Sequence, residues 1–167
     1  MTSPTDTARR DGFQTLLQQH RGIVAKVAGT YAWHPDDRDD LMQDIATQLW
    51  KAWPGYDPAR PFATWMYRIA LNVAISDVRS RTRGPSPETW NEEHHDVADP
   101  HAHDHEGRQQ VDQLYRFIHA QPPLDRALLL LYLDDRSHRE MADVLGLSET
   151  NVATKISRLK QRLRNEL

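Results

Sequence analysis

The stretch Pro61–Arg83, PFATWMYRIALNVAISDVRSRTR, predicts one helix with two unlike faces. Its apolar side chains mostly recur three or four positions apart, as in an amphipathic helix packed on its neighbours: Trp65, Ile69, Leu71, Val73, Ile75 and Val78. The other face carries Thr64, Tyr67, Arg68, Asn72 and Ser76, and the helix ends in Arg79, Arg81 and Arg83. Aromatic rings stack on bases and arginines neutralise phosphates, so this face suits single-stranded or opened DNA. The alternative is a solvated helix whose basic end complements the helix dipole.

Composition favours an all-α protein. The 167 residues include only 7 glycines, and helix-forming residues dominate. The absence of cysteine excludes disulfides and thiolate metal sites. No apolar run approaches the ~18 residues of a membrane span, and the N-terminal residues lack the apolar segment of a signal peptide. We therefore expect a cytoplasmic protein with no membrane insertion.

The net charge of −3 is distributed unevenly along the chain. Residues 1–83 hold 11 Lys and Arg against 9 Asp and Glu, and residues 108–167 hold 10 against 8. Residues 84–107 hold none against 7. Two mildly basic modules thus flank an acidic connector. We expect weak binding to free DNA, and a second protein that brings the chain to its site.

In the first module, residues 1–10 are expected to form a flexible N-terminus. A helical period from Asp11 predicts a helix that ends near Ala32. Asp36 or Asp37 is expected to cap a second helix, which continues to Trp53. Leu41, Ile45 and Leu49 form the predicted buried stripe of that helix, and the outward positions include Asp40, Gln43 and Asp44. Trp50 lies near the boundary, where it is either an exposed anchor for a partner or a core residue.

The segment Pro54–Pro61, with three prolines and a glycine, breaks this helix and forms a stiff loop. The loop directly precedes the two-faced helix. It is either a plain connection or, through Tyr56 and Arg60, part of a pocket for an unstacked base.

Two motifs of this module resemble the second conserved region of bacterial sigma factors, sigma-70 family, of the extracytoplasmic-function type. They are Asp40-Leu-Met-Gln-Asp44 and Trp65-Met-Tyr-Arg-Ile-Ala-Leu-Asn72, followed by Asp77 and the arginines. The resemblance implies that the first motif binds the clamp helices of the RNA polymerase β′ subunit, through Asp40, Gln43, Asp44 and Trp50. It implies that the second motif and the loop capture and melt the minus-ten element, through Tyr56, Arg60, Trp65, Arg68, Asn72, Arg79 and Arg81.

Residues 84–107 change composition abruptly to proline, acids and histidine, which predicts a flexible linker. Five histidines lie among its carboxylates: His94, His95, His101, His103 and His105. Histidine and carboxylate together bind zinc, nickel or copper, but a specific site needs fixed geometry. We therefore assign no metal site. The resemblance gives this acidic linker another role, a path through the polymerase toward the RNA exit channel.

Residues 108–167 predict a second helical module. One helix runs from Arg108 to before Gln121, and the strongly apolar segment Leu124–Leu133 is expected at the centre. Met141, Ala142, Val144 and Leu145 form a short helix, and Ser148 caps the next one after a turn at Gly146. Val152, Ile156, Leu159 and Leu163 recur with a helical period. This arrangement is typical of a helix-turn-helix.

The outward face of the last helix carries side chains that are able to reach base edges or phosphates. This module resembles the fourth conserved region of sigma factors, which reads the minus-thirty-five element and meets the polymerase β flap. The residues placed there are Arg139, Thr150, Asn151, Ala153, Thr154, Lys155, Ser157 and Arg158. The family usually has a basic residue where this chain has Ala153, so Arg158, Asn151 and Arg139 are expected to take more of the contact.

The sequence thus predicts an all-α sigma factor of two helical domains joined by a flexible acidic linker. It is not expected to be an enzyme or to hold a cofactor. The expected partners are core RNA polymerase, promoter DNA and an anti-sigma factor. One alternative is a stand-alone helix-turn-helix regulator, which leaves the motifs of the first module unexplained. Another is a metal-dependent hydrolase that uses the linker histidines.

Overall fold

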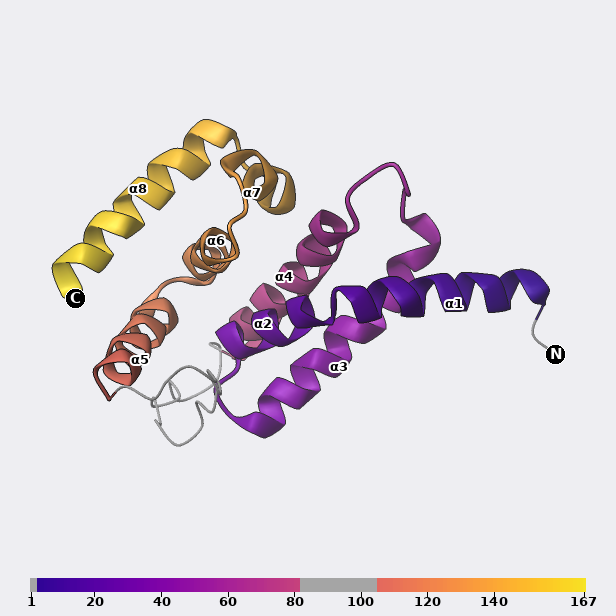
Figure 1. The fold of residues 1–167 in the computed structure, drawn as a ribbon, viewed down its shortest axis with the longest axis horizontal. Coiled ribbons are helices and arrows are strands. Elements are labelled where there is room, and N and C mark those ends of the chain that lie inside the picture. The colour runs from indigo at the N-terminus through magenta and orange to yellow at the C-terminus, as the bar shows by residue number, and fades with distance from the viewer. Residues whose placement is uncertain (1–2, 82–104) are drawn as a thin grey trace.

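The structure, a computed structural model, describes residues 3–81 and 105–167. All regular elements in these two ranges are helical, which confirms the predicted fold class (Figure 1). In chain order they are α1 Pro4–Gln19, α2 Arg21–Tyr31, α3 Pro35–Ala52, the 3-10 turn η1 Trp53–Gly55, α4 Phe62–Arg81, α5 His105–Ala120, α6 Pro123–Leu133, α7 His138–Leu145 and α8 Glu149–Glu166.

Helices α2, α3 and α4 pack on one another and form the core of the first module. Leu41, Ile45 and Leu49 on α3 are fully buried, as their spacing predicted. They meet Val27 of α2 and Met66 of α4 in the same core. Helix α1 projects from this bundle, and of its residues only Phe13 is buried (Figure 1). The first module is therefore a three-helix bundle with one outlying helix.

The predicted N-terminal boundaries were wrong in two places. Residues 4–10 are not a flexible tail, because α1 already begins at Pro4, whose fixed φ suits the first position of a helix. The single helix expected up to Ala32 is two helices, because His20 leaves the helical region at φ −115° and ψ 20°. The exposed, polar first half of α1 has no apolar period, so the sequence pattern gave no sign of it.

Helix α3 begins one position before the predicted caps. His34 is its N-cap, Pro35 occupies the first helical position, and no side chain caps the backbone. Asp36 and Asp37 lie instead in the first turn, where carboxylates interact favourably with the helix dipole. A proline that supplies the helical φ makes a side-chain cap less necessary.

Helix α4 follows the predicted pattern with one important exception. Leu71 and Val78 are buried, and Trp65, Ile69, Val73 and Ile75 are half-buried. Tyr67, which the sequence placed on the polar face, is 0% exposed. It is buried because the second module covers this side of α4, an arrangement that periodicity within one helix cannot reveal.

The second module contains the predicted helix-turn-helix, α7 and α8. Gly146 takes the left-handed conformation, φ 68°, which lets the chain turn sharply after α7. Ser148 caps α8 as expected, since its side chain accepts a hydrogen bond from the Asn151 amide. Helix α8 packs on α6, whose residues Ala127–Leu131 are all buried, and α7 packs on α8. The expected centre of the module is therefore confirmed.

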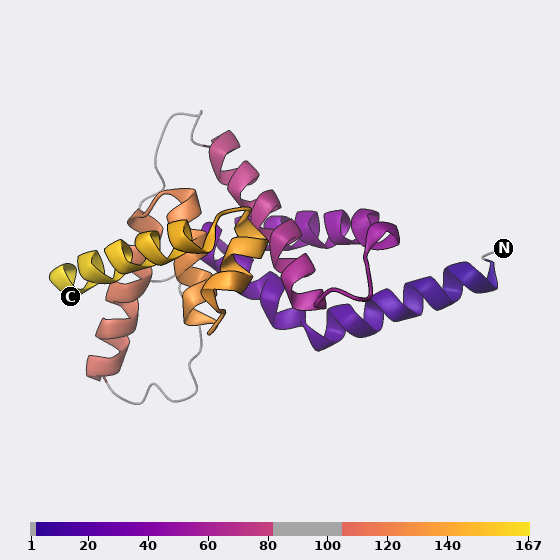
Figure 2. The same cartoon turned by 90° about the horizontal axis from the view of Figure 1, so that it is seen from above.

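The two modules pack directly against each other. Helices α6 and α7 contact α4, and α5 and α6 contact α2. Both views show α6 and α7 alongside the first module, with α8 on the outer side (Figures 1 and 2). The sequence predicted the two modules but not this packing.

Candidate polymerase and nucleic-acid interface

Helix α3 presents the first candidate surface. Asp40, Gln43 and Asp44 are all exposed, and their spacing of three and four residues places them on one face. Trp50, two turns beyond Gln43, is 45% exposed. Its ring also lies 5.2 Å from that of Phe13 on α1. Trp50 is therefore neither fully exposed nor a core residue, and its role as an anchor for a partner stays a prediction.

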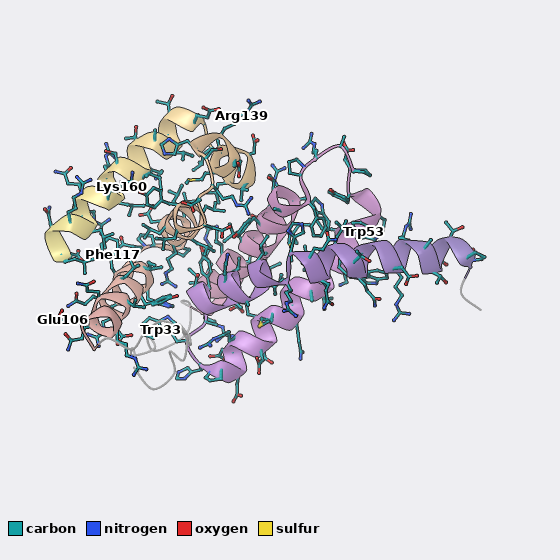
Figure 3. The ribbon with its side chains drawn as sticks, in the orientation of Figure 1. Trp33, Trp53, Glu106, Phe117, Arg139 and Lys160 are labelled. Atoms are coloured by element: carbon teal, nitrogen blue, oxygen red, sulfur yellow. The ribbon has the colours of Figure 1, made fainter. Side chains whose placement is uncertain are left out.

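An aromatic cluster surrounds the loop before α4. The rings of Trp53 and Tyr56 are stacked 5.3 Å apart, and the ring of Trp65 lies 5.1 Å from that of Tyr56. Phe62 closes the cluster, 5.3 Å from Trp65. The Tyr56 hydroxyl donates a hydrogen bond of 2.8 Å to the Arg60 carbonyl. These contacts fix the loop onto the start of α4, while Tyr56 and Trp65 stay partly accessible. Trp53 lies between this loop and α1 (Figure 3).

The exposed face of α4 continues from this cluster toward the end of the helix. Arg68, Asn72 and Arg79 are exposed on one side, at spacings of four and seven residues. Arg81 also lies at the surface, but its guanidinium pairs with Asp37 at 3.0 Å and with Asp77 at 3.1 Å. Burial acts to lower the pKa of Arg81, and these two carboxylates outweigh it and raise the pKa. Arg81 therefore ties α4 to α3 in this structure, and any phosphate contact competes with those pairs.

The third candidate surface is on α8 and the start of α7. Thr150, Asn151, Thr154, Ser157 and Arg158 are exposed along α8, whereas Ala153 and Lys155 are half-buried. Arg139 is exposed on the outer side of α7 (Figure 3). The predicted residues of this set therefore lie at the start of α7 and in the first ten residues of α8. Of this set, Arg139, Lys155 and Arg158 are the cationic members.

Sequence reasoning missed a polar cluster where the modules meet. Asp134 directly follows α6, and its carboxylate accepts hydrogen bonds from Lys26 Nζ at 2.6 Å, Tyr67 Oη at 2.6 Å and Arg136 Nε at 3.1 Å. The guanidinium of Arg136 lies 5.4 Å from the centre of the Tyr67 ring. The only sequence signal was a carboxylate at the end of an apolar helix, which indicates no partner by itself.

Burial and hydrogen bonding shift the pKa values of this cluster. Burial acts to raise the pKa of the Asp134 carboxyl, but the hydrogen bonds from Lys26, Tyr67 and Arg136 prevail and lower it. For Tyr67, burial first and then the Asp134 carboxylate raise the pKa above its ordinary value. Asp134 is therefore ionised and Tyr67 neutral at physiological pH, which is the combination that their hydrogen bond requires.

A groove lies beside this cluster, with a volume of about 440 Å³. Helices α2 and α3 contribute Lys26, Thr30, Arg38 and Met42 to its walls. The second module contributes Tyr115, Ile118, Leu130, Leu133 and Asp134. The groove is largely apolar and exists only where the two modules meet.

No cluster of three or more His, Asp or Glu side chains in residues 3–81 and 105–167 is arranged to hold a metal ion. The linker histidines His94, His95, His101 and His103 lie outside these ranges. The helices of the described ranges also lack the combination of length and hydropathy that crossing a bilayer requires.

Comparison with known proteins identifies both modules. The family described as Sigma-70 region 2 matches residues 16–84, and that described as Sigma-70, region 4 matches residues 112–163. The RNA polymerase sigma factor CnrH of Cupriavidus metallidurans is 31% identical, over 90% of this chain and 84% of its own length. The ECF sigma factor RpoE of Cereibacter sphaeroides is 30% identical, over 93% of this chain and 83% of its own length.

A longer relative is the ECF sigma factor SigE of Mycolicibacterium smegmatis, 27% identical over 97% of this chain. The chain spans 64% of the length of SigE.

Two solved structures share the fold. Sigma factor RpoE of Bartonella quintana, in complex with the anti-sigma factor NepR, has a TM-score of 0.68 at 17% identity and covers 94% of this chain and 96% of that one. CnrH, in complex with the cytosolic domain of CnrY, has a TM-score of 0.66 at 24% identity. The match covers 93% of this chain and 87% of that one.

These matches exclude the stand-alone regulator and the hydrolase, because both predicted regions are present in order over most of the chain. Sigma factors are not enzymes; the polymerase supplies the chemistry. With relatives of 30% identity or more matched over most of their length, this chain belongs to the extracytoplasmic-function type of sigma-70 factors, which direct RNA polymerase to promoters.

Proposed function

We propose that the first module joins polymerase to the minus-ten element by two separate faces. Asp40, Gln43, Asp44 and Trp50 on α3 bind the clamp helices of the β′ subunit. The face of α4 that carries Arg68 and Asn72 captures the non-template strand. The observation that carries this assignment is that both sets are exposed, on different helices of one bundle. One rigid module therefore fixes the strand relative to the polymerase.

Promoter melting then follows from binding energy. Unstacking costs a few kcal/mol per base step, and stacking and phosphate contacts on the opened strand offset that cost. Tyr56 and Trp65 supply the stacking surfaces, and Arg60, beside Tyr56, is exposed for a phosphate. Arg79 and, after release from its carboxylates, Arg81 extend the phosphate path.

The second module reads the minus-thirty-five element with α8 in the major groove. Asn151, Thr154 and Arg158 face outward near the start of the helix, as base-reading side chains must. Arg139 and Lys155 contact the phosphates. Ala153 contributes no charge, so Arg158 carries more of the recognition. The same module meets the β flap of polymerase.

The protein acts in the cytoplasm and has an anti-sigma factor as a partner. Supporting this, one of the similar solved structures is a complex with the anti-sigma factor NepR. A partner helix with an apolar face matches the groove between the modules, whose walls include Met42, Ile118 and Leu133.

A crossed pair of substitutions tests the two faces of the first module. Asp44→Arg reverses a charge on α3 and is expected to abolish binding to core polymerase without unfolding the bundle, because Asp44 is exposed. Asn72→Ala, equally exposed on α4, is expected to retain polymerase binding and to reduce promoter opening at least about tenfold. Polymerase binding is measured by co-purification, and opening by permanganate reactivity of unpaired thymines.

Asp11→Arg, the same charge reversal at an exposed position of α1 outside the proposed set, is the matched control and is expected to behave as the wild type. Unchanged co-purification of Asp44→Arg contradicts the clamp assignment. Equal losses of polymerase binding and opening in Asn72→Ala contradict the strand assignment.

A further inference from the structure

Trp53 belongs to the aromatic cluster, but the proposed function gives it no role. Its side chain is half-buried, and its ring is stacked on that of Tyr56, with an angle of only 17° between the two planes. The Trp53 carbonyl also accepts a hydrogen bond of 3.0 Å from the Tyr56 amide. The position of Tyr56 relative to Trp53 is therefore set twice, by ring stacking and by the backbone.

Helix α1 in turn holds Trp53. The indole N–H donates a hydrogen bond of 3.0 Å to the Arg9 carbonyl, and the ring centre lies 5.4 Å from that of Phe13. Gly12 brings the backbone of α1 close to the same ring, since a Cβ at this position would lie 3.7 Å from Trp53 Cζ2. An indole nitrogen is a donor only, so its single hydrogen bond fixes the direction of the ring as well as its place.

The rest of the loop is also fixed before any strand binds. The Asp57 carboxylate accepts a hydrogen bond of 3.0 Å from the Ala59 amide, and the Asp57 carbonyl accepts one of 3.0 Å from the Arg60 amide. The Tyr56 hydroxyl is bonded to the Arg60 carbonyl at the far end of its ring. A ring that is already held in place loses less conformational freedom when a ligand stacks on it, so the loop is preorganised for binding.

The ring contacts of Tyr56 leave one face for a base. Trp53 is nearly parallel to Tyr56 and stacks on one face. Phe62 and Trp65 meet the Tyr56 ring at 87° and 52°, so neither of them is stacked on it. Tyr56 is nevertheless only half-buried. A base that stacks on Tyr56 therefore takes the face opposite Trp53.

We propose that Trp53 is a positioning residue for strand capture: held by α1, it fixes the Tyr56 ring so that the unstacked base completes a stack of three rings. This inference rests on the role of Tyr56 in the proposed function. Trp53 acts through Tyr56 and does not touch the base. Because every base has a π-face, such a stack adds affinity for a base without selecting its identity.

The test uses the full chain bound to core polymerase, with the non-template strand of a promoter that this holoenzyme transcribes. An abasic site replaces each base of the minus-ten element in turn, which removes the base and keeps the phosphates. Fluorescence anisotropy gives the Kd of each strand. In the wild type, loss of the base that stacks on Tyr56 is expected to weaken binding at least about fivefold. That base is identified as the one whose loss no longer matters in Tyr56→Leu.

Trp53→Leu removes the supporting ring and keeps an apolar side chain. It is expected to reduce the effect of the missing base at this position to less than about twofold, while the Kd of the abasic strand stays at the wild-type value. A general defect of the fold would weaken binding to both strands alike. Trp53→Phe retains a ring that stacks on Tyr56 and is expected to restore part of the effect.

Trp33→Leu is the matched control. Trp33 is half-buried like Trp53 and lies at the opposite end of the first module (Figure 3). This variant is expected to keep the full effect of the missing base. Circular dichroism checks that each variant is folded.

The outcomes separate this inference from the function on which it rests. A full effect of the missing base in Trp53→Leu overturns the positioning role, and so does equal weakening of both strands. A Trp53→Phe variant that resembles Trp53→Leu overturns the stack of three rings. If no position in the wild type loses its effect in Tyr56→Leu, the base pocket of the proposed function fails, and the inference fails with it.

Discussion

At the scale of single residues, Asp134 shows how a carboxylate gains its importance from its surroundings. Three donors from two modules converge on it, and its side chain is only 16% exposed. Their hydrogen bonds favour the ionised carboxylate more than burial disfavours it, so the pKa lies below the ordinary value of 3.8. Its contribution to stability is therefore fully present above that ordinary value and is lost as the pH falls through the lowered one.

We predict that Asp134→Asn lowers the free energy of unfolding by about 2 kcal/mol at pH 7, the scale of hydrogen bonds to a charged group. The deficit relative to the wild type should begin to shrink below the ordinary value of 3.8 and should be lost as the pH falls through the lowered pKa of the wild-type carboxyl. Urea denaturation at pH 7, 5 and about 2.5 measures it. Asp135→Asn is the control, since Asp135 is exposed beside Asp134 and has φ 56°, a conformation that asparagine tolerates. A deficit that stays constant to about pH 2.5 would rule out the ionic role.

The sequence could predict the exposed site residues better than the buried polar ones. Asp40, Asp44 and Asn72 lie at the surface because a helical period places them opposite an apolar stripe. Tyr67 was assigned to the wrong face, and Asp134 was not recognised at all. Their environment comes from a helix more than sixty residues away in the chain, and no local pattern carries that information.

At the scale of helices, the helix-turn-helix is the element whose local chemistry agrees best with its structure. Gly146 supplies the left-handed turn and Ser148 the cap of α8. Val152, Ile156 and Leu159 are all buried, as their helical period predicts, so the opposite side of α8 faces outward. Helix α1 is the opposite case. The first half of α1 is exposed and polar, so it has no apolar period from which a helix could be predicted.

We predict that Ser148→Ala destabilises the second module by about 1 kcal/mol, because the Asn151 amide loses its hydrogen-bond acceptor. Thermal unfolding followed by circular dichroism should show this as a fall of several degrees in melting temperature. Ser157→Ala changes the same residue type at an exposed position inside α8 and should raise stability by a few tenths of a kcal/mol, because alanine has the higher helix propensity. Equal losses in the two variants would contradict the capping role.

At the scale of the whole molecule, the two modules are joined twice, through the chain and through their packed faces. Residues 82–104 connect α4 to α5, and 23 residues span at most about 75 Å. The modules touch in the structure, so this packing does not use the full reach. We therefore expect the linker length to limit transcription but not the packing.

We predict that deletion of residues 86–97 reduces transcription from a two-element promoter at least about tenfold, because the remaining 11 residues reach only about 36 Å. Replacement of the same residues by an equal number of glycines and serines should preserve most of the activity. In vitro transcription with core polymerase measures both. Similar losses in the two variants would show that the acidic composition, and not the length, is required.

The groups that join the two modules are divided between the two halves of the chain, with Lys26 and Tyr67 on one side of the linker and Asp134 on the other. The modules are consequently not interchangeable parts. A recombinant that joins the first half of this chain to a second half without a carboxylate at the position of Asp134 inherits two donors without their acceptor. Such a chimaera loses part of the contact between its modules, so natural exchange at the linker is expected to favour halves in which both sides of this contact are inherited together.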